Sequence, residues 1–270
     1  MGKAALVIDS LQEQFPKRSG RILAQFSCGA ASAVATKLAI EKYGDAVEIY
    51  YCDTGSEHHD NERFLQSCEV WFQRKINILR SEDYSDIWEV FESRRYISGP
   101  MGAPCTGAMK RIPSDKVWQI GDVEIFGYTA DESSRLERFR EQNNERLIEC
   151  PLIDRCLTKE DCFGILDREG IRLPDMYKLG FRNNNCLGCV KARDSIDYWK
   201  RIRKFFPEKF ERMAGIERDI GHTINRERVN GERVPIFLDE IPEGDPNPKA
   251  ADPNIQCGLF CMAESDNFSR

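Results

Sequence analysis

The 270-residue sequence lacks any apolar run long enough to cross a membrane, which takes about 18 consecutive apolar residues or more. Its first residues, MGKAALVIDSLQEQF, carry a short apolar patch without the sustained hydrophobic region of a signal peptide. Hydrophobic residues make up 41% of the chain and charged residues 31%, which is ordinary for a globular protein. We therefore expect a cytoplasmic protein with no membrane partner.

The sequence also lacks an excess of positive charge. Lysine and arginine number 39 against 45 aspartate and glutamate residues, and the formal net charge is −6. No broad basic field therefore points to a nucleic-acid-binding protein. Two local basic patches, at residues 135–140 and 191–204, are more typical of solvated helix faces than of a nucleic-acid groove.

Cysteine, by contrast, is abundant, with eleven residues. A reducing compartment argues against structural disulfides, so we expect some of these thiols to serve a metal or redox site. Cys186 and Cys189 form a C-x-x-C pair, a spacing that suits a metal half-site or a redox dithiol and that also arises by chance. A second pair of thiols would come from Cys105, Cys257 and Cys261. The remaining cysteines are expected to be small buried side chains: Cys28, Cys52, Cys68, Cys150, Cys156 and Cys162.

Short apolar runs typical of β-strands occur at residues 22–26, 47–51, 76–79 and 123–128. Helical patterns follow them: one ends near Gly44, and the others span roughly residues 57–75, 106–118 and 131–145. Strands that alternate with helices predict an α/β fold with a mostly parallel, Rossmann-like sheet flanked by helices. Ligands of such sheets bind in the loops that follow the carboxyl ends of the strands.

The pattern changes after residue 150. Thr158 and Asp161 predict a helix start, and Pro207 predicts the first turn of a later helix. From Gly231 onward the chain is rich in proline, aspartate and glycine and shows no periodicity. We predict three consecutive parts: a nucleotide-binding α/β domain at 1–155, a helical cysteine-containing region at 156–230 and an irregular cysteine-containing tail at 231–270.

A turn of small residues, SCGAAS at 27–32, joins the first predicted strand to the first predicted helix. Backbone N–H groups converge at such a junction, and the helix N-terminus adds about half a positive charge, which suits phosphate, sulfate or pyrophosphate. The turn has neither the lysine of a Walker loop nor the spacing of G-x-G-x-x-G. Small residues at this place also simply permit close packing of helix on sheet, and the pattern alone leaves both interpretations open.

Four stretches carry a family resemblance. They are the S-x-G-x-x-S turn, YCDTGSEHHDNERF (51–64), FGYTADESSRLERFRE (126–141) and the segment from PLID at 151 to CLGC at 189. In this order they resemble the phosphoadenosine-phosphosulfate (PAPS) reductase family of the PP-loop adenosine nucleotide α-hydrolase superfamily. The resemblance covers about residues 20–206 and implies an adenine nucleotide α-hydrolase-like fold.

The resemblance implies that an adenylyl sulfate-type nucleotide or ATP binds this domain. Ser27, Gly29 and Ser32 would bind its phosphate or sulfate end. Asp53 would bond to the ribose or to a bound cation, and Arg135 would pair with a phosphate or sulfate. The residues expected to bind nucleotide are Ser27, Cys28, Gly29, Ala30, Ala31, Ser32, Asp53, Thr54, Gly127, Tyr128, Glu132 and Arg135.

Two details qualify the nucleotide site. ATP pyrophosphatases of the superfamily resemble S-G-G-x-D-S, whereas here Ala31 stands in place of the aspartate and Cys28 in place of the first glycine. The missing carboxylate weighs against Mg·ATP chemistry and favours a sulfonucleotide. Glu132 would orient Arg135, although the same residues, taken alone, suit an ordinary charge pair at a helix N-terminus.

The resemblance also implies a metal centre. Cluster-bearing adenylyl-sulfate reductases resemble C-C-x-x-x-K where this chain has Cys105 and Thr106, so one thiol of the tandem is missing. With Cys186, Cys189 and Cys261 beside Cys105, four thiolates would hold a 4Fe-4S cluster, which the family favours, or zinc.

The tail contains QCGL at 256–259, which resembles the E-C-G-L ending of sulfonucleotide reductases, although Phe260 replaces the family's histidine. Cys257 is therefore the candidate nucleophile. It would attack the sulfur of the nucleotide and form a thiosulfonate, from which a second thiol, on the protein or on a thioredoxin-like reductant, would release sulfite. The two roles could also be exchanged, with Cys261 as the nucleophile and Cys257 as the metal ligand.

We therefore expect a PAPS-reductase-like enzyme of sulfur metabolism that reduces its nucleotide to sulfite. Glu132, Ser133 and the C-x-x-C pair also resemble the sulfurtransferase subunit of DNA phosphorothioation systems. Such an enzyme would use ATP to adenylate and then thiolate a nucleic acid or a small molecule, and only this alternative implies a nucleic-acid partner. A third alternative is a non-catalytic iron–sulfur protein that senses nucleotides.

Overall fold

The computed structural model describes residues 20–99, 102–247, 250 and 255 of the chain. These residues form two compact units, each built from separate stretches of sequence. The first unit combines the described residues up to Tyr51 with Leu65–Asn77 and Asp115–Arg172, and the second combines Cys52–Phe64, Ile78–Ser114 and the described residues from Leu173 onward. The units therefore interleave along the chain, and the division into three consecutive parts at 1–155, 156–230 and 231–270 stays a prediction.

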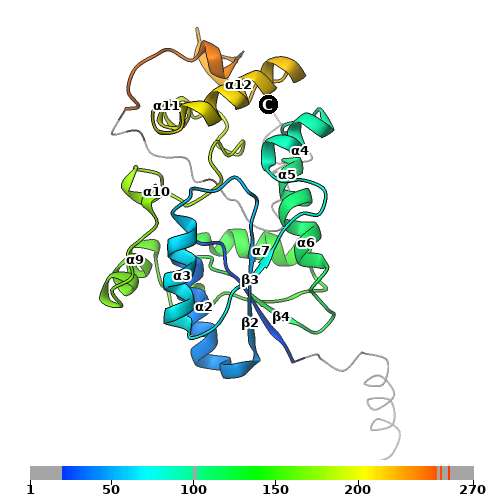
Figure 1. Ribbon diagram of the computed structural model, residues 1–270, viewed down its shortest axis with the longest axis vertical. Helices are drawn as coiled ribbons and strands as arrows, with labels where there is room; N and C mark the ends of the chain where they lie inside the picture. Colours follow the sequence, from blue (N-terminus) through cyan, green and yellow to red (C-terminus); the bar gives the residue numbers. More distant parts are fainter. Residues whose placement is uncertain (1–19, 100–101, 248–249, 251–254, 256–270) are drawn as a thin grey trace, which may run out of the picture. The chain divides into compact units, whose positions relative to one another are not determined.

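Five short strands form one sheet: β1 (Ile22–Gln25), β2 (Val47–Cys52), β3 (Asn77–Leu79), β4 (Val123–Ile125) and β5 (Leu147–Glu149). Their order is β3-β2-β1-β4-β5, and β1 pairs in parallel with both β2 and β4. Figure 1 labels β2, β3 and β4 of this sheet. All four residues of β1 are buried, as expected for the central strand of a parallel sheet. The predicted α/β fold with a mostly parallel sheet is confirmed.

Helices follow the strands: α2 (Ala30–Tyr43), α3 (Asn61–Phe72), α7 (Ser133–Gln142), α8 (Pro151–Asp154) and α9 (Lys159–Arg168). In the first unit α2 packs against β1, β4, α8 and α9. Small buried residues such as Ala30 and Ala33 let this helix lie close to the sheet. Two predicted helix-end signals are confirmed. Gly44 takes a positive φ of 54° at the end of α2, and Thr158 caps the start of α9 together with Asp161.

The second unit is mainly helical and includes α4 (Ile87–Arg94), α5 (Pro104–Thr106), α6 (Ile112–Asp115), α10 (Asp175–Lys178), α11 (Ile196–Phe205), α12 (Pro207–Ile220), β6 (Asn225–Val229) and β7 (Glu232–Ile236). Helix α12 packs against α4 and α11. Trp88, Phe91, Tyr198 and Trp199 are almost fully buried in the core of this unit. The large aromatic side chains thus give the second unit a hydrophobic core of its own.

The helix predicted for residues 106–118 is observed at 104–115, with a π-helical turn at Gly107–Arg111 between α5 and α6. Pro113 has no N–H for the helical ladder, which accounts for the local change in hydrogen bonding. One prediction about secondary structure is wrong. Residues after Gly231 are not all irregular, since β7 pairs antiparallel with β6. Asn230 and Gly231 both have positive φ, as the tight hairpin turn requires.

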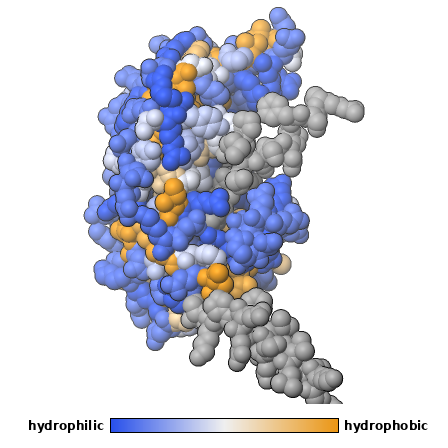
Figure 2. All heavy atoms as spheres, turned by 90° about the vertical axis from the view of Figure 1, so that its right-hand side faces the viewer, coloured by the Kyte–Doolittle hydropathy of each residue, from blue (hydrophilic) through white to orange (hydrophobic). Residues whose placement is uncertain are grey.

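Most of the face shown in Figure 2 is hydrophilic, and hydrophobic residues occur on it in separate spots. Single exposed apolar side chains, such as Val70 and Ile120, are normal for a folded chain. None of the helices in the described part of the chain combines the length and the apolar character that a membrane span requires.

The carboxylate of Glu217 ties α12 to the hairpin. It is fully buried and accepts backbone N–H groups from Ile224 (2.5 Å) and Leu238 (2.7 Å). Burial raises the pKa of Glu217 to about 7, although the two N–H groups act against the rise. The folded chain therefore favours the protonated carboxyl, and ionisation of this group weakens the fold.

This raised pKa predicts a pH-dependent stability. Below the unfolded pKa of about 4.3 the contribution of Glu217 is fully present, and it is lost as the pH rises through the folded pKa, by a few kcal/mol. In Glu217→Gln this loss should be absent, so the free energy of unfolding in urea should fall less between pH 5 and pH 8. Glu211→Gln, at an exposed position of α12, is the control. Equal pH dependence in both variants would contradict the assignment.

Candidate functional site

The turn between β1 and α2 has the geometry of an anion-binding turn. Cys28 has a φ of 58° and Gly29 an extended backbone at the N-cap of α2. The N–H groups of Ser27 and Gly29 both point to the hydroxyl oxygen of Ser32, at 3.1 and 3.3 Å. Two amides thus converge on one oxygen at a helix N-terminus, the arrangement that an oxygen of a phosphate or sulfate requires.

The side chains of this turn differ in exposure. Ser27 is exposed, whereas Cys28 and Ala30 are fully buried and Ser32 is nearly so. The hydroxyl of Ser27 also donates to that of Ser32, at 3.0 Å, so the two amides and this hydroxyl all meet at the Ser32 oxygen. The thiol of Cys28 belongs to the hydrophobic core of the first unit.

Gly127 lies directly against this turn. A Cβ atom at this position would be 2.7 Å from both the nitrogen and the Cα atom of Ser32. Real Cβ atoms essentially never come this close to backbone, so any other residue would push the two segments apart. The glycine of the FGYTADESSR stretch is thus required by the anion-binding turn that precedes it in the chain.

Replacing Gly127 by alanine is expected to destabilise the fold by about 1–3 kcal/mol and to weaken nucleotide binding, because the helix start at Ser32 must shift. Chemical unfolding and calorimetry with adenylyl sulfate measure the two effects. Gly215→Ala is the control, because Gly215 lies in α12 with no atom near the added methyl group. A Gly127→Ala protein with unchanged stability and affinity would contradict this role.

Arg135 is held in place by two neighbours. Its Nη1 atom lies 2.6 Å from Oε1 of Glu132, and its guanidinium lies 4.5 Å from the ring centre of Tyr128. The other oxygen of Glu132 accepts from the backbone N–H of Thr129 at 3.1 Å, and the Thr129 hydroxyl donates to Asp131 at 2.6 Å. The ion pair expected between Glu132 and Arg135 is present, and together with Tyr128 it sets the direction of the guanidinium group. Its pairing with a phosphate or sulfate stays a prediction.

In the second unit, Asp53 and Thr54 point to different surroundings. The carboxylate of Asp53 accepts from the backbone N–H of Gly55 (2.9 Å) and from Arg80 (2.9 Å). Thr54 is fully buried, and its hydroxyl lies 3.1 Å from the sulfur of Cys186. Thr54 therefore lies at the cysteine pair of the chain.

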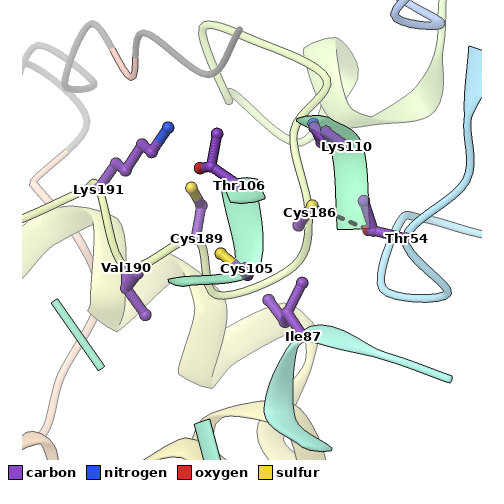
Figure 3. Close-up of a pocket in the computed structure, with 9 residues that line it drawn as sticks. All are labelled: Thr54, Ile87, Cys105, Thr106, Lys110, Cys186, Cys189, Val190 and Lys191. Carbon is purple, nitrogen blue, oxygen red and sulfur yellow. Dashed lines mark hydrogen bonds between the residues drawn. The ribbon is translucent and has the colours of Figure 1, made fainter. Parts of the chain in front are cut away.

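A cavity of the second unit brings three cysteines together (Figure 3). Cys105 comes from α5, and Cys186 and Cys189 come from the loop before α11. The volume of the cavity is about 10 Å³, about the space that one water molecule needs. The other lining residues are Thr54, Ile87, Thr106, Lys110, Val190 and Lys191.

The loop that carries the cysteine pair is fixed by its neighbours. Gly188 takes a φ of 72°, which lets the chain turn between the two thiols. The backbone N–H of Cys189 donates to the hydroxyl of Tyr198 (3.0 Å), and that of Leu187 donates to the carbonyl of Ser56 (2.8 Å). The C-x-x-C loop is thus bound to the D-T-G segment as well as to α11.

The thiol of Cys186 shares a hydrogen-bond chain with Thr54 and Glu57. The Thr54 hydroxyl donates to Glu57 at 2.6 Å, and its single proton is then used, so the Cys186 thiol donates to Thr54. The backbone N–H groups of Thr54 and Ser56 also donate to Glu57. Burial raises the pKa of Glu57, and the positive charge of Lys110 opposes the rise.

Thr106 contributes a second polar group to this cavity. It occupies the place of the missing tandem cysteine, and its buried hydroxyl oxygen has no hydrogen-bond partner among the described residues. Buried polar groups are usually paired, so an unpaired hydroxyl in a cavity indicates a place for a bound group. The donor chemistry of three thiols and one hydroxyl suits a thiolate-ligated metal, and the water-sized cavity would have to widen to hold a cluster.

The sulfur atoms of these cysteines do not converge on a single metal position. In the part of the chain that the structure describes, no three histidine, cysteine, aspartate or glutamate side chains are arranged to hold a metal ion. Cys257 and Cys261, the predicted nucleophile and fourth ligand, lie outside the described residues. The metal centre and its ligands therefore stay a prediction.

A family model for the phosphoadenosine phosphosulfate reductase domain matches residues 21–193. The chain belongs to this family. As a PAPS reductase-family chain it contains a nucleotide-binding domain, and the match spans both the anion-binding turn and the C-x-x-C pair. The family resemblance inferred from the four sequence motifs is confirmed.

Individual relatives are distant. An uncharacterized protein from Methanocaldococcus jannaschii is 24% identical over 238 residues, which are 82% of this chain and 53% of the relative. The chain thus spans about half the length of the curated relative it matches. The PAPS reductase of Candida auris, solved as a phosphate complex, is 12% identical with a TM-score of 0.47, over 67% of this chain and 86% of that chain. The NH3-dependent NAD synthetase of Campylobacter jejuni is 13% identical with a TM-score of 0.40, over 80% and 91%.

The sequence predictions missed part of the cysteine cavity of this PAPS reductase-family chain. Glu57, Lys110 and Lys191 were not expected there, and Thr106 was noted only as a missing cysteine. Lys110 ends the C-T-x-x-x-K stretch, so its motif was a usable signal. Glu57 carries no local signal, because the fold brings it to Cys186, whereas Lys191 lies at the cavity because it follows Cys189 by two residues.

Proposed function

We propose that this chain is a sulfonucleotide reductase, which converts an adenylyl sulfate-type nucleotide to sulfite and AMP or its 3′-phosphate form. The observation that carries the proposal is the turn at residues 27–32, in which the amides of Ser27 and Gly29 converge on the Ser32 hydroxyl at a helix N-terminus. An anionic oxygen of the nucleotide would take the place of that hydroxyl, and Ala31 supplies no carboxylate to repel it. Such a turn suits a sulfate or phosphate group that is not bound to a metal ion. The family of the chain supports the same ligand class.

The proposed reaction has two steps. The thiolate of Cys257 attacks the sulfur atom of the nucleotide, a sulfur–sulfur bond forms, and the bond from sulfur to the nucleotide oxygen breaks, so that the nucleotide leaves as a phosphate anion. A second thiolate then attacks the sulfur of Cys257, which forms a disulfide and releases sulfite. The two thiols supply the two electrons, and a thiol or thioredoxin-like reductant restores them.

The chain's own residues would bind and orient the nucleotide. The turn at Ser27 and Gly29 would accept one anionic end, and Arg135, ordered by Glu132 and Tyr128, would pair with a second oxygen group. Since Arg135 is already held in one orientation, little conformational entropy is lost when the nucleotide binds.

Cys105, Cys186 and Cys189 would hold a 4Fe-4S cluster, with Cys261 as the fourth ligand, and zinc is the alternative metal. A bound cluster supplies a redox-active centre whose potential depends on hydrogen bonds to its sulfur ligands. The hydroxyl oxygen of Thr54 lies 3.1 Å from the sulfur of Cys186, and it would make such a bond if its proton turned from Glu57 to a deprotonated Cys186.

The test is product analysis with the purified full chain. Adenylyl sulfate, with and without a 3′-phosphate, is incubated with dithiothreitol, and sulfite and the released nucleotide are measured. The proposal expects both products in equal amounts. If neither nucleotide gives sulfite, the proposal is contradicted.

A second function is favoured by one observation, the unpaired Thr106 hydroxyl in a cavity with only three described cysteines. Three thiolate ligands would leave one position for a non-protein sulfur ligand, as an ATP-dependent sulfurtransferase requires. That enzyme would release pyrophosphate from ATP on addition of its acceptor. Pyrophosphate release without sulfite formation would favour this function over the reductase.

A further inference from the structure

The hairpin β6–β7 separates its charges between its two faces. Residues directly opposite each other in an antiparallel pair lie on the same face, and side chains alternate along each strand. Arg228 lies opposite Arg233, and Arg226 lies two residues before Arg228, so all three arginines share one face. The other face carries Glu227 opposite Val234, and Val229 opposite Glu232.

The arginine face is only partly neutralised. Asp194 accepts from Arg226 with both oxygens, at 3.1 and 2.7 Å, and lies 3.4 Å from Arg233. Arg228 is exposed, and no ion pair of Arg228 occurs within the described residues. Like charges directly opposite each other in a hairpin are destabilising, so the pair of Arg228 and Arg233 weakens the hairpin when nothing is bound.

A destabilising cluster of arginines on an exposed hairpin indicates a multiply charged anionic partner. Guanidinium groups bind phosphate with two parallel hydrogen bonds, which makes arginine the preferred residue for this contact. From strand geometry, the Cα atoms of Arg226 and Arg228 are about 7 Å apart along the strand. The Cβ atoms of Arg228 and Arg233, which face each other across the pair, are about 5 Å apart. The three groups would therefore reach separate phosphates of one polyanion.

We propose that the β6–β7 hairpin binds the phosphate backbone of double-stranded DNA. A two-stranded β-ribbon fits the major groove of B-DNA, which is about 12 Å wide. The major groove of duplex RNA is too narrow and deep for such a ribbon. Proteins that bind single strands stack the bases on aromatic side chains, and the arginine face holds Arg226, Arg228, Arg233 and Pro235 but no aromatic residue.

This proposal does not depend on the reductase reaction. If the chain is a sulfurtransferase, the hairpin would supply its contact with nucleic acid. A measurement of DNA binding tests the proposal by itself, whichever reaction the chain catalyses. The negative net charge of the whole chain makes a local arginine cluster the necessary source of attraction for DNA.

The test is fluorescence anisotropy of the full-length protein with a short labelled DNA duplex at several salt concentrations. Arg228→Gln should weaken binding roughly fivefold and reduce the slope of log affinity against log salt by about 0.9. The triple variant Arg226→Gln, Arg228→Gln, Arg233→Gln should reduce that slope by about 3. Arg228→Lys should retain most of the binding, because the charge is kept.

Asp194 provides a test of opposite sign. Asp194→Asn removes the carboxylate that competes with phosphate, so it should tighten DNA binding. Asp194 has a φ of 57°, and asparagine tolerates this left-handed conformation, so the backbone should be kept. Arg168→Gln, at an exposed position in the first unit, removes the same charge as Arg228→Gln and should leave binding unchanged.

Three results would overturn the proposal. One is an unmodified protein that does not bind the duplex at low salt. Another is equal binding by the unmodified protein and the triple variant, with circular dichroism showing that both are folded. The third is that single-stranded DNA, duplex RNA or polyglutamate competes as well as the duplex, which would assign the hairpin to a different partner.

Discussion

Replacing Cys257 by serine is expected to lower sulfite formation from adenylyl sulfate by at least about 10³-fold, because serine is a far weaker nucleophile toward sulfur. Nucleotide affinity should stay within a factor of about two, since the anion-binding turn and Arg135 would supply the binding contacts. Steady-state sulfite release and isothermal calorimetry measure the two quantities separately.

The control for this variant is Cys156→Ser. Cys156 is exposed in the first unit and has no assigned role, so its loss should change neither rate nor affinity. Full activity in Cys257→Ser would assign the nucleophile to another thiol. If Cys261→Ser is then inactive, the roles of the two tail cysteines are exchanged. If both variants stay active, the thiosulfonate mechanism is wrong.

Replacing Cys189 by serine is expected to remove most of the bound iron and sulfide from protein prepared without oxygen. Cys105, Cys186 and Cys189 line one cavity, and a cluster that loses one of these thiolate ligands is held much less tightly. Iron and sulfide analysis and the visible absorption spectrum measure the loss. The same result is expected for Cys105→Ser and Cys186→Ser.

Controls for the metal prediction come from other buried cysteines. Cys68 and Cys162 belong to the hydrophobic core and line no part of the cavity, so Cys68→Ala and Cys162→Ala should keep the metal content of the unchanged protein. An unchanged protein that contains zinc and no sulfide would replace the cluster by the alternative metal. A protein without any metal after anaerobic preparation would contradict the metal centre altogether.

The sheet could be predicted from the sequence because its strands are short, apolar and separated by helical patterns. β1 and β2 were expected nearly at their observed bounds. β5 was missed, since three residues, Leu147–Glu149, are too few to show a period. Strand β7 was missed because Pro235 within the run argues against a strand, although the Asn230-Gly231 turn was a readable hairpin signal.

The candidate site could be predicted only in part. The small residues at 27–32 indicated an anion-binding turn, but the contact of Gly127 with Ser32 joins segments almost a hundred residues apart and has no local signal. Thr54 was expected beside the nucleotide because of its D-T-G motif, whereas its hydroxyl lies at Cys186. Such contacts depend on tertiary structure, which neither periodicity nor spacing encodes.

The central claim is that the chain takes the sulfonate group of a nucleotide onto a cysteine. Intact mass spectrometry of the reduced protein, incubated with adenylyl sulfate after removal of free thiols, tests it most directly. The account predicts one added sulfonate per chain, located at Cys257 by peptide mapping and released as sulfite when dithiothreitol is added. An unmodified chain that instead cleaves ATP to AMP and pyrophosphate would contradict it.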